Sequence, residues 1–286
     1  MCLHEEAHGV DASHPIFQGP FPVVPTLQPM PTPEHYKKLN PGLGDSMPAW
    51  RVHRDQIGKY VGVVADGFGF ADSPDAEWIA SGRNSKNARA AALARQGNFF
   101  HWGFAASPPE MTDEAQRVFL NTLVYMRKFA GQKPLVVGEQ RSREWLPVYV
   151  AYSDELPPYV KDQLPTAWLD GAGKDMAMLR RLATEQLGFV RRDGKRWQVD
   201  AECARLGIDN RLVGSLRSCV GWLADESKAQ PARAVLERYT GEHFATAAEW
   251  QRWLDDAGER LFHSDGIGRF VIAPRDCPPP HRAKVQ

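Results

Sequence analysis

The sequence predicts a mixed α/β fold, in which an α/β layer precedes a mostly α-helical module. Short apolar segments bounded by glycine and proline indicate strands between residues 50 and 104. An amphipathic pattern at 112–130 indicates a helix that closes this layer, and further helical patterns follow residue 174. We therefore expect an α/β layer at 1–140, a connecting segment at 141–165, a helical module at 166–273 and a disordered tail at 274–286.

Residues 15–48 form a proline-rich segment ahead of the first predicted strand. Its nine prolines break helices and disfavour central strands, and it carries few charges. Apolar side chains such as Ile16, Phe17 and Phe21 would form an exposed patch if the segment lay in water. We therefore expect an ordered strap over a surface, and a longer native chain, a second copy or a partner protein that completes the sheet at its edge.

Local signals mark the strands of the first half. Residues 50–53 and 60–65 are strand candidates, and 66–69 is a turn signal. Residues 90–104 indicate a hairpin that turns at Gly97.

The helices carry capping signals. Thr112 can cap the helix at 112–130. Later helices are expected at 174–187, at 210–223, at 231–239 and after Thr246. Thr246 and Glu249 have the spacing of a capping box. Residues 261–273 alternate weakly in hydropathy and indicate a final hairpin.

Composition excludes several function classes. Lys and Arg number 35 against 35 Asp and Glu, so the formal net charge is zero and we expect no nucleic-acid partner. No apolar run approaches the roughly 20 residues of a membrane span, so no membrane partner is expected. The first six residues lack the pattern of a signal peptide, which predicts a cytoplasmic protein; a longer native N-terminus would instead predict a periplasmic or secreted one. The four cysteines form no C-x-x-C pair.

The N-terminal segment His4-Glu5-Glu6-Ala7-His8 matches H-E-x-x-H, and His14 has the spacing of a third ligand. On a helix, two such histidines can hold zinc while the glutamate acts as general base, so a zinc metallopeptidase is one alternative. Asp11 stands where the longer motif needs glycine, and Gly9 and Pro15 leave little room for a helix. We therefore expect no zinc.

Two further segments hold candidate ligand-binding residues. Residues 81–86 form a polar, basic loop in which Arg83, Asn84 and Lys86 could hold a phosphate or sulfate; a solvated turn is the alternative. In the hairpin at 90–104, the candidates are Arg95 on the first strand and His101 and Trp102 on the second. His101 would lie near the C-terminal end of that strand, where ligands of α/β layers collect, or would be a hydrogen-bonded core group.

Other chemistries lack their sequence signals. There is no G-x-S-x-G nucleophile elbow and no glycine-rich dinucleotide loop, so no cofactor is expected. The carboxylates show no spacing that selects an acid/base pair. The sequence therefore favours a non-catalytic binding or scaffolding protein. The alternative is an enzyme acting on a sugar at a site near His101 and residues 81–86.

Residues 8–137 resemble the trehalose-utilisation (ThuA-like) domains of the class I glutamine-amidotransferase-like superfamily. Residues 14–19 resemble the H-P-I-x-x-G segment of that family, residues 94–104 resemble its late strand, and the helix at 112–130 would be its closing helix. The resemblance implies a partial flavodoxin-like layer, a link to carbohydrate metabolism and a sugar ligand. Its first strands, with any nucleophilic cysteine, would precede residue 1, so no catalytic residue is carried over.

Uncharacterised bacterial proteins provide a nearer resemblance. They carry N-F-F-x-W-G-F, here residues 98–104, followed by S-P-x-x-M-T-x-E-A, here residues 107–115. Tyr239-Thr240-Gly241, with Trp250 and Trp253, resembles the edge of a HEAT-like helical module in such proteins.

Overall fold

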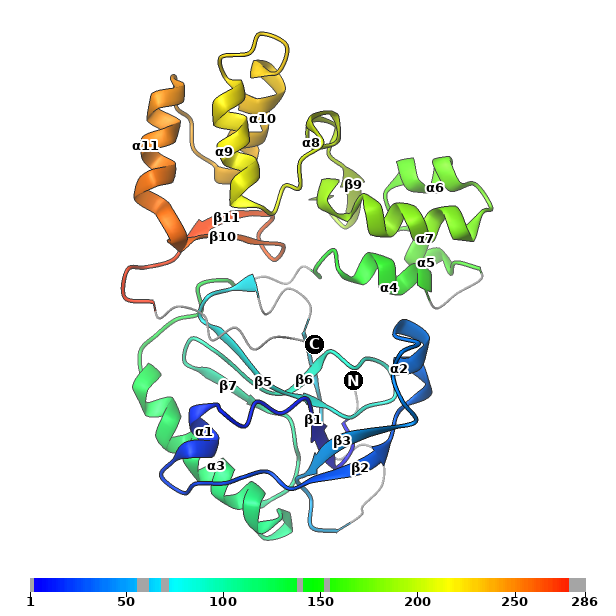
Figure 1. The fold of residues 1–286 in the computed structure, drawn as a ribbon, viewed down its shortest axis with the longest axis vertical. Helices are drawn as coiled ribbons and strands as arrows, with labels where there is room; N and C mark the ends of the chain where they lie inside the picture. Colours follow the sequence, from blue (N-terminus) through cyan, green and yellow to red (C-terminus); the bar gives the residue numbers. More distant parts are fainter. Residues whose placement is uncertain (1–2, 56–61, 68–71, 138–140, 152–154, 278–286) are drawn as a thin grey trace. The chain divides into compact units, whose positions relative to one another are not determined.

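The computed structural model describes residues 3–55, 62–67, 72–137, 141–151 and 155–277. Their contacts form two compact units, one within Met1–Leu135 and the other within Val136–Cys277. Strands and helices occur together, which confirms the predicted mixed α/β fold (Figure 1). Within these ranges, no helix has the length and apolar character needed to cross a membrane.

The first unit is built on a curled sheet of seven strands. They are β1 (Glu6–His8), β2 (Leu27–Pro31), β3 (Ser46–Arg51), β4 (Ala65–Asp66), β5 (Ala76–Gly82), β6 (Ala90–Gln96) and β7 (Phe99–Trp102). Their order is β2-β3-β1-β5-β6-β4, and β7 also pairs with β6. Every pair of named strands is antiparallel. A flavodoxin-like layer is parallel, so the described strands do not supply the arrangement that the family resemblance implies.

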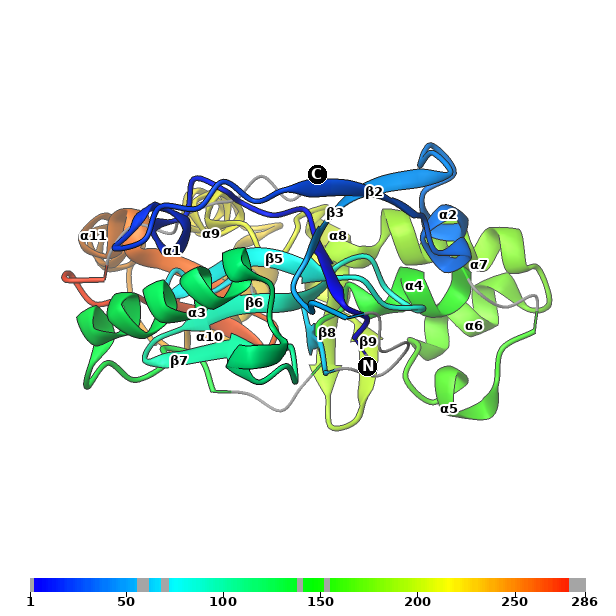
Figure 2. The same ribbon diagram turned by 90° about the horizontal axis from the view of Figure 1, so that it is seen from below.

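One face of this sheet carries the core. Helix α3 (Asp113–Met126) lies along the sheet beside the short helix α1 (Pro15–Gln18), as Figure 2 shows. Phe17 of α1 packs edge-on against Trp50 of β3, with ring centroids 5.7 Å apart. The Thr112 hydroxyl accepts a hydrogen bond from the N–H of Ala115, so the predicted cap is confirmed.

The proline-rich segment is more regular than the predicted strap. It contains α1, β2, the helix α2 (Glu34–Leu39) and the first half of β3. Pro29 and Pro31 are tolerated because β2 is the edge strand of the sheet, where one side of the backbone needs no partner. Ile16 and Phe17 are buried within the unit, whereas Val24 is 88% exposed.

Predictions for the other strands had mixed outcomes. The hairpin at 90–104 is confirmed, with Gly97 at φ +52° in its turn. Residues 60–61 and 68–69 lie outside the described residues. Strand β5 was not predicted, although it is buried along its whole length between β1 and β6.

The second unit contains helices and two hairpins. In its first part, α4 (Trp145–Ala151), α5 (Pro158–Lys161), α6 (Thr166–Ala172) and α7 (Met176–Glu185) share a core with the hairpin of β8 (Val190–Asp193) and β9 (Arg196–Val199). In its second part, α8 (Ala201–Leu206), α9 (Val213–Trp222), α10 (Ala229–Thr240) and α11 (Ala247–Ala257) share another core with the hairpin of β10 (Leu261–Ser264) and β11 (Arg269–Ile272).

The predicted helices of this unit and its last hairpin are present. Thr246 and Glu249 form the predicted capping box. The segment expected as a connection at 141–165 instead contains α4 and α5, because Pro147 and Pro158 lie in or beside the first turn, where no N–H is needed. Residues 278–286 of the expected tail lie outside the described residues.

Candidate functional site

The last three residues of the H-E-x-x-H segment, Glu6–His8, form strand β1, and none of the segment is helical. β1 pairs with β3 on one side and with β5 on the other, and these two ladders hold the segment extended. In a strand, alternate residues share a side, so Glu6 and His8 project together while Ala7 projects to the other side; His4 and Glu5 precede the strand. The geometry that a helix would give to a zinc-binding histidine pair is therefore absent, and the helical interpretation of the motif is wrong.

His14 is held elsewhere in the unit. Its Nδ1 accepts a hydrogen bond from the N–H of Ile16 at the start of α1, and its Nε2 lies 3.2 Å from the carboxylate of Glu77. Across the described ranges, no three His, Cys, Asp or Glu side chains come together as a group that could hold a metal ion.

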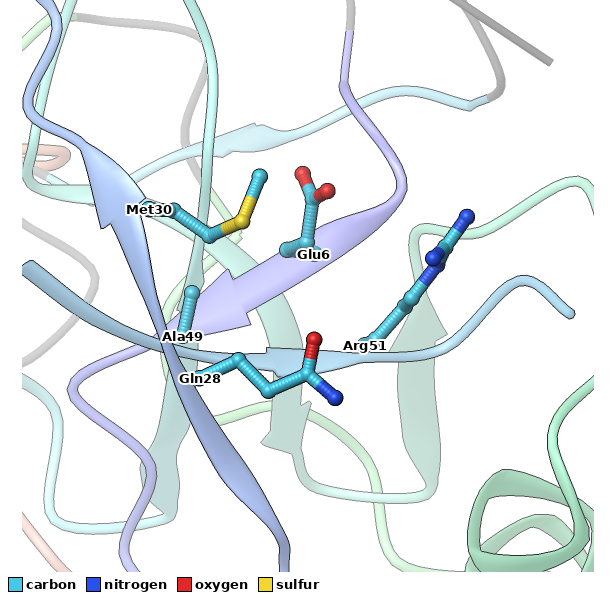
Figure 3. Close-up of a pocket in the computed structure, with 5 residues that line it drawn as sticks. All are labelled: Glu6, Gln28, Met30, Ala49 and Arg51. Carbon is cyan, nitrogen blue, oxygen red and sulfur yellow. The ribbon is translucent and has the colours of Figure 1, made fainter. Parts of the chain in front are cut away.

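A small pocket opens over strands β1, β2 and β3. Its volume is about 150 Å³, and its lining residues are Glu6, Gln28, Met30, Ala49 and Arg51. The antiparallel register places Glu6 opposite Arg51 and Gln28 opposite Ala49. Figure 3 shows Glu6, Met30 and Arg51 projecting to the same side of the strands.

Arg83 connects this pocket to the predicted polar loop at 81–86. Its N–H donates to the carbonyl of Glu6 at 2.9 Å, and its carbonyl accepts from the N–H of His4 at 2.8 Å. Its Nη1 lies 3.2 Å from the Glu6 carboxylate and 3.3 Å from Nδ1 of His4. The structure thus joins two segments that are separate candidates in the sequence.

Burial controls the ionisation of these groups. Burial raises the pKa of Glu6, even though the charge and hydrogen bond of Arg83 act to lower it. Burial, together with the positive charge of Arg83, lowers the pKa of His8 to about 4. Both effects favour the neutral forms, as expected for ionisable groups removed from water.

Several nitrogen atoms around Glu6 are buried without a hydrogen-bond partner among the described residues. They are Nε of Arg51, Nε of Arg83 and Nε2 of His8. Buried polar atoms in proteins are almost always hydrogen-bonded, so a group of unpartnered ones calls for an explanation. Of these three residues only Arg51 lines the pocket, so its guanidinium is the one that a polar ligand in the pocket would reach.

Asn84 has a structural role in its loop. Its amide nitrogen donates to the carbonyls of Gly82 and Asn87, while its amide oxygen accepts from the N–H groups of Lys86 and Asn87. The hydroxyl of Tyr36 accepts from the N–H of Asn84 at 3.0 Å. Asn84 is fully buried and fastens the loop, and Lys86 is exposed next to it.

The other three candidates lie away from the pocket. Arg95 donates to Glu77 and to the carbonyl of Gly97, so its guanidinium already has internal partners. His101 lies on β7, which β6 and β5 separate from β1, and its Nε2 is 3.1 Å from the carbonyl oxygen of Val63. Burial lowers the pKa of His101. Trp102 packs edge-on against Phe119, with ring centroids 5.1 Å apart.

Sequence reasoning missed Gln28, Met30 and Arg51. These residues meet Glu6 only through the register of β2, β3 and β1, which no local pattern reveals. One signal was present: alternation within His4-Glu5-Glu6-Ala7-His8 is also compatible with a strand.

Comparisons with known proteins assign this chain to no family. No family model matches it, and no curated protein or solved structure matches it either. The function is therefore argued from the pocket itself.

Proposed function

We propose that this protein binds a small polyhydroxylated molecule of the sugar class in the pocket formed by β1, β2 and β3. The observation that carries the proposal is the buried Glu6 carboxyl group, which lies beside two arginines whose Nε atoms have no hydrogen-bond partner among the described residues. Buried ionisable groups gathered in a concave site are typical of functional sites.

The size and chemistry of the pocket favour this ligand class. At about 150 Å³ the pocket is smaller than the roughly 300–1,000 Å³ of sites for drug-sized ligands, so the ligand is small. A sugar hydroxyl both donates and accepts hydrogen bonds. Glu6 offers acceptors, Arg51 offers donors and the amide of Gln28 offers both. Met30 adds an apolar wall for the C–H groups of a sugar ring.

The family resemblance supports the same ligand class. ThuA-like domains suggest a carbohydrate, and we propose a relationship to them on the segments at 14–19 and 94–104. The flavodoxin-like layer and the HEAT-like module belong to this proposal as well. The antiparallel pairing of the described strands counts against the first of these.

Calorimetric titration of the full chain with a panel of monosaccharides, disaccharides and sugar alcohols tests the proposal. We expect saturable binding of at least one compound. Glu6→Gln and Arg51→Met should each weaken it by about tenfold or more, since each removes hydrogen bonds to a charged group. The control is Arg54→Met, which removes an exposed arginine just beyond β3 that pairs with Asp113. Absence of binding, or equal binding by all variants, would overturn the proposal.

One observation favours an enzymatic function of the same pocket. Because burial raises the pKa of Glu6, its carboxyl group holds a proton at higher pH than an exposed glutamate, as a general acid must. The sugar-acting enzyme expected around His101 is less favoured, because β5 and β6 separate His101 from the pocket. Chromatography of each bound sugar after incubation tests this: product formed by the native protein and abolished in Glu6→Gln would establish catalysis.

Self-association through the sheet edge stays a prediction, and the edge strand offers little support for it. Pro29 and Pro31 of β2 have no N–H to donate to an added strand. Light scattering at increasing protein concentration measures this directly.

A further inference from the structure

Arg192, in the second unit, forms no ion pair with an acidic side chain among the described residues. In the β8–β9 hairpin, Arg192 lies opposite Trp197, and its guanidinium carbon is 5.3 Å from the centroid of the Trp197 ring. Nε and Nη1 of Arg192 are buried and have no hydrogen-bond partner in the described part of the chain. Burial lowers the pKa of Arg192. Packing against Trp197 therefore holds the guanidinium of Arg192 in place, and its Nε and Nη1 donors are left without partners among the described residues.

A second arginine and a tyrosine belong to the same cluster. Arg141 donates from Nη1 to the hydroxyl of Tyr149 at 2.6 Å. Tyr149 in turn lies 3.4 Å from the amide oxygen of Gln163, whose backbone carbonyl accepts from the N–H of Trp197 at 3.1 Å. Both Tyr149 and Arg141 act electrostatically on Arg192. Contacts through Tyr149, Gln163 and Trp197 therefore connect Arg141 to the residue against which Arg192 packs.

The carboxylate that acts on this cluster already has partners. Asp265 affects Arg192 electrostatically, but it accepts hydrogen bonds from Nε and the backbone N–H of Arg143 and from the hydroxyl of Ser142. The cluster therefore combines two guanidinium groups with a phenol hydroxyl, and among the described residues neither Arg141 nor Arg192 forms an ion pair with a carboxylate. Guanidinium groups match the oxygens of phosphate in geometry and charge.

We propose that Arg141 and Arg192 form a binding site for the phosphate group of a small phosphorylated molecule. This site lies within the second unit and is independent of the sugar pocket over β1. Phosphate oxygens would accept from the buried donors of Arg192, while Arg141 and the Tyr149 hydroxyl complete the positive and polar surroundings.

Titration of the full chain with inorganic phosphate, at constant ionic strength and with chloride as the reference anion, tests the site. Arg192→Met and Arg141→Met keep the apolar stems and remove the charges. Each should weaken phosphate binding by about tenfold or more. Arg191→Met is the matched control, because Arg191 is the neighbouring residue on β8 and projects to the opposite side, 3.9 Å from Asp200. Its phosphate affinity should stay within about twofold of the native value.

A second measurement separates ligand binding from a structural role. Because Arg192 has buried donors without partners, Arg192→Met should raise the Tm in phosphate-free buffer and should lose the further rise that phosphate gives the native protein. A lower Tm without phosphate together with an unchanged phosphate effect would overturn the proposal. So would an equal effect of chloride and phosphate on the native protein, or no effect of phosphate at all.

Discussion

Arg95 donates a hydrogen bond from Nε to the carboxylate of Glu77 at 2.6 Å, and both side chains are buried inside the first unit. The same carboxylate accepts from the hydroxyl of Tyr125, and His14 lies 3.2 Å away. Burial would raise the pKa of Glu77, but the hydrogen bonds from His14 and Arg95 outweigh it and lower the pKa to about 2. The pair therefore holds β5, β6, α1 and α3 together through one ionised group.

Removing one member of this pair should be costly. Glu77→Leu leaves the Arg95 charge buried without its carboxylate, and Arg95→Met leaves the Glu77 carboxylate with only His14 and the Tyr125 hydroxyl as partners. We expect each to lower the free energy of unfolding by about 3–5 kcal/mol, measured by urea unfolding of the full chain.

The double variant Glu77→Leu/Arg95→Met decides whether the pairing itself is responsible. The free energy of unfolding should decrease by clearly less in the double variant than the sum of the decreases in the two single variants, because no unpaired charge remains. Arg117→Met, on the exposed side of α3, is the control and should change stability by no more than about 0.5 kcal/mol. Strictly additive losses would show that the two residues act separately.

Stability should fall between pH 6 and pH 5, because of two buried histidines. Burial first, and then a neighbouring arginine, lowers the pKa of both His8 and His263 from 6.5 to about 4. In this range each histidine binds a proton in the unfolded chain but not in the folded one. The free energy of unfolding therefore decreases as the pH falls. The expected slope is about 1.4 kcal/mol per pH unit for each histidine.

Comparison with variants isolates this effect from the carboxyl groups. Glu6, with its raised pKa, acts in the opposite direction. We therefore expect His8→Gln and His263→Gln each to reduce the measured slope relative to the native protein, in urea unfolding at pH 5.0, 5.5 and 6.0. A slope unchanged in both variants would contradict the assignment.

The elements that the sequence predicted well are those with local signals. The cap at Thr112, the box of Thr246 with Glu249 and the turn at Gly97 each depend on residues within a few positions of one another. Each of these features depends on residues of one short segment, so the local sequence pattern is sufficient to predict it.

The elements that the sequence did not predict depend on distant partners. Strand β1 has three residues and becomes extended because Ala7 pairs with Trp50 on one side and with Gly82 on the other. The pocket has the same origin, since Glu6 and Arg51 meet only through that pairing. The sequence indicates His4 and His8 only as ligands of a helical zinc site, and Arg83 only as part of a separate loop, because side-chain period alone does not fix strand register.

Gly62 should tolerate no side chain. It bridges to Phe104 at φ +155°, and a Cβ there would collide with the backbone carbonyl of Gly103. Backbone cannot move aside as a flexible side chain can, so Gly62→Ala should lower the free energy of unfolding by at least about 2 kcal/mol. In Gly214→Ala, on α9, a Cβ meets no atom within 4 Å, and stability should rise by up to about 1 kcal/mol. Equal effects of the two substitutions would contradict this prediction.

Arg143 and Asp265 should determine how the second unit unfolds. Nε of Arg143 donates to Asp265 at 2.8 Å, and its Nη1 donates to the amide oxygen of Asn210 at 2.6 Å and to the carbonyl of Leu187 at 3.3 Å. One buried guanidinium therefore connects the segment before α4, the turn that follows α7, the segment before α9 and the turn after β10. These segments border both cores of the unit, so the contact couples the two cores.

We expect Asp265→Asn to lower the free energy of unfolding by about 3–5 kcal/mol, because Arg143 keeps its charge in a buried site. The coupling adds a second expectation. The unfolding transition in urea should broaden, since a weaker connection lets one core open before the other. Asp170→Asn, at an exposed position of α6, controls for loss of an acidic group. A variant with native steepness and a stability change within about 0.5 kcal/mol would show that the two cores are held together by other contacts.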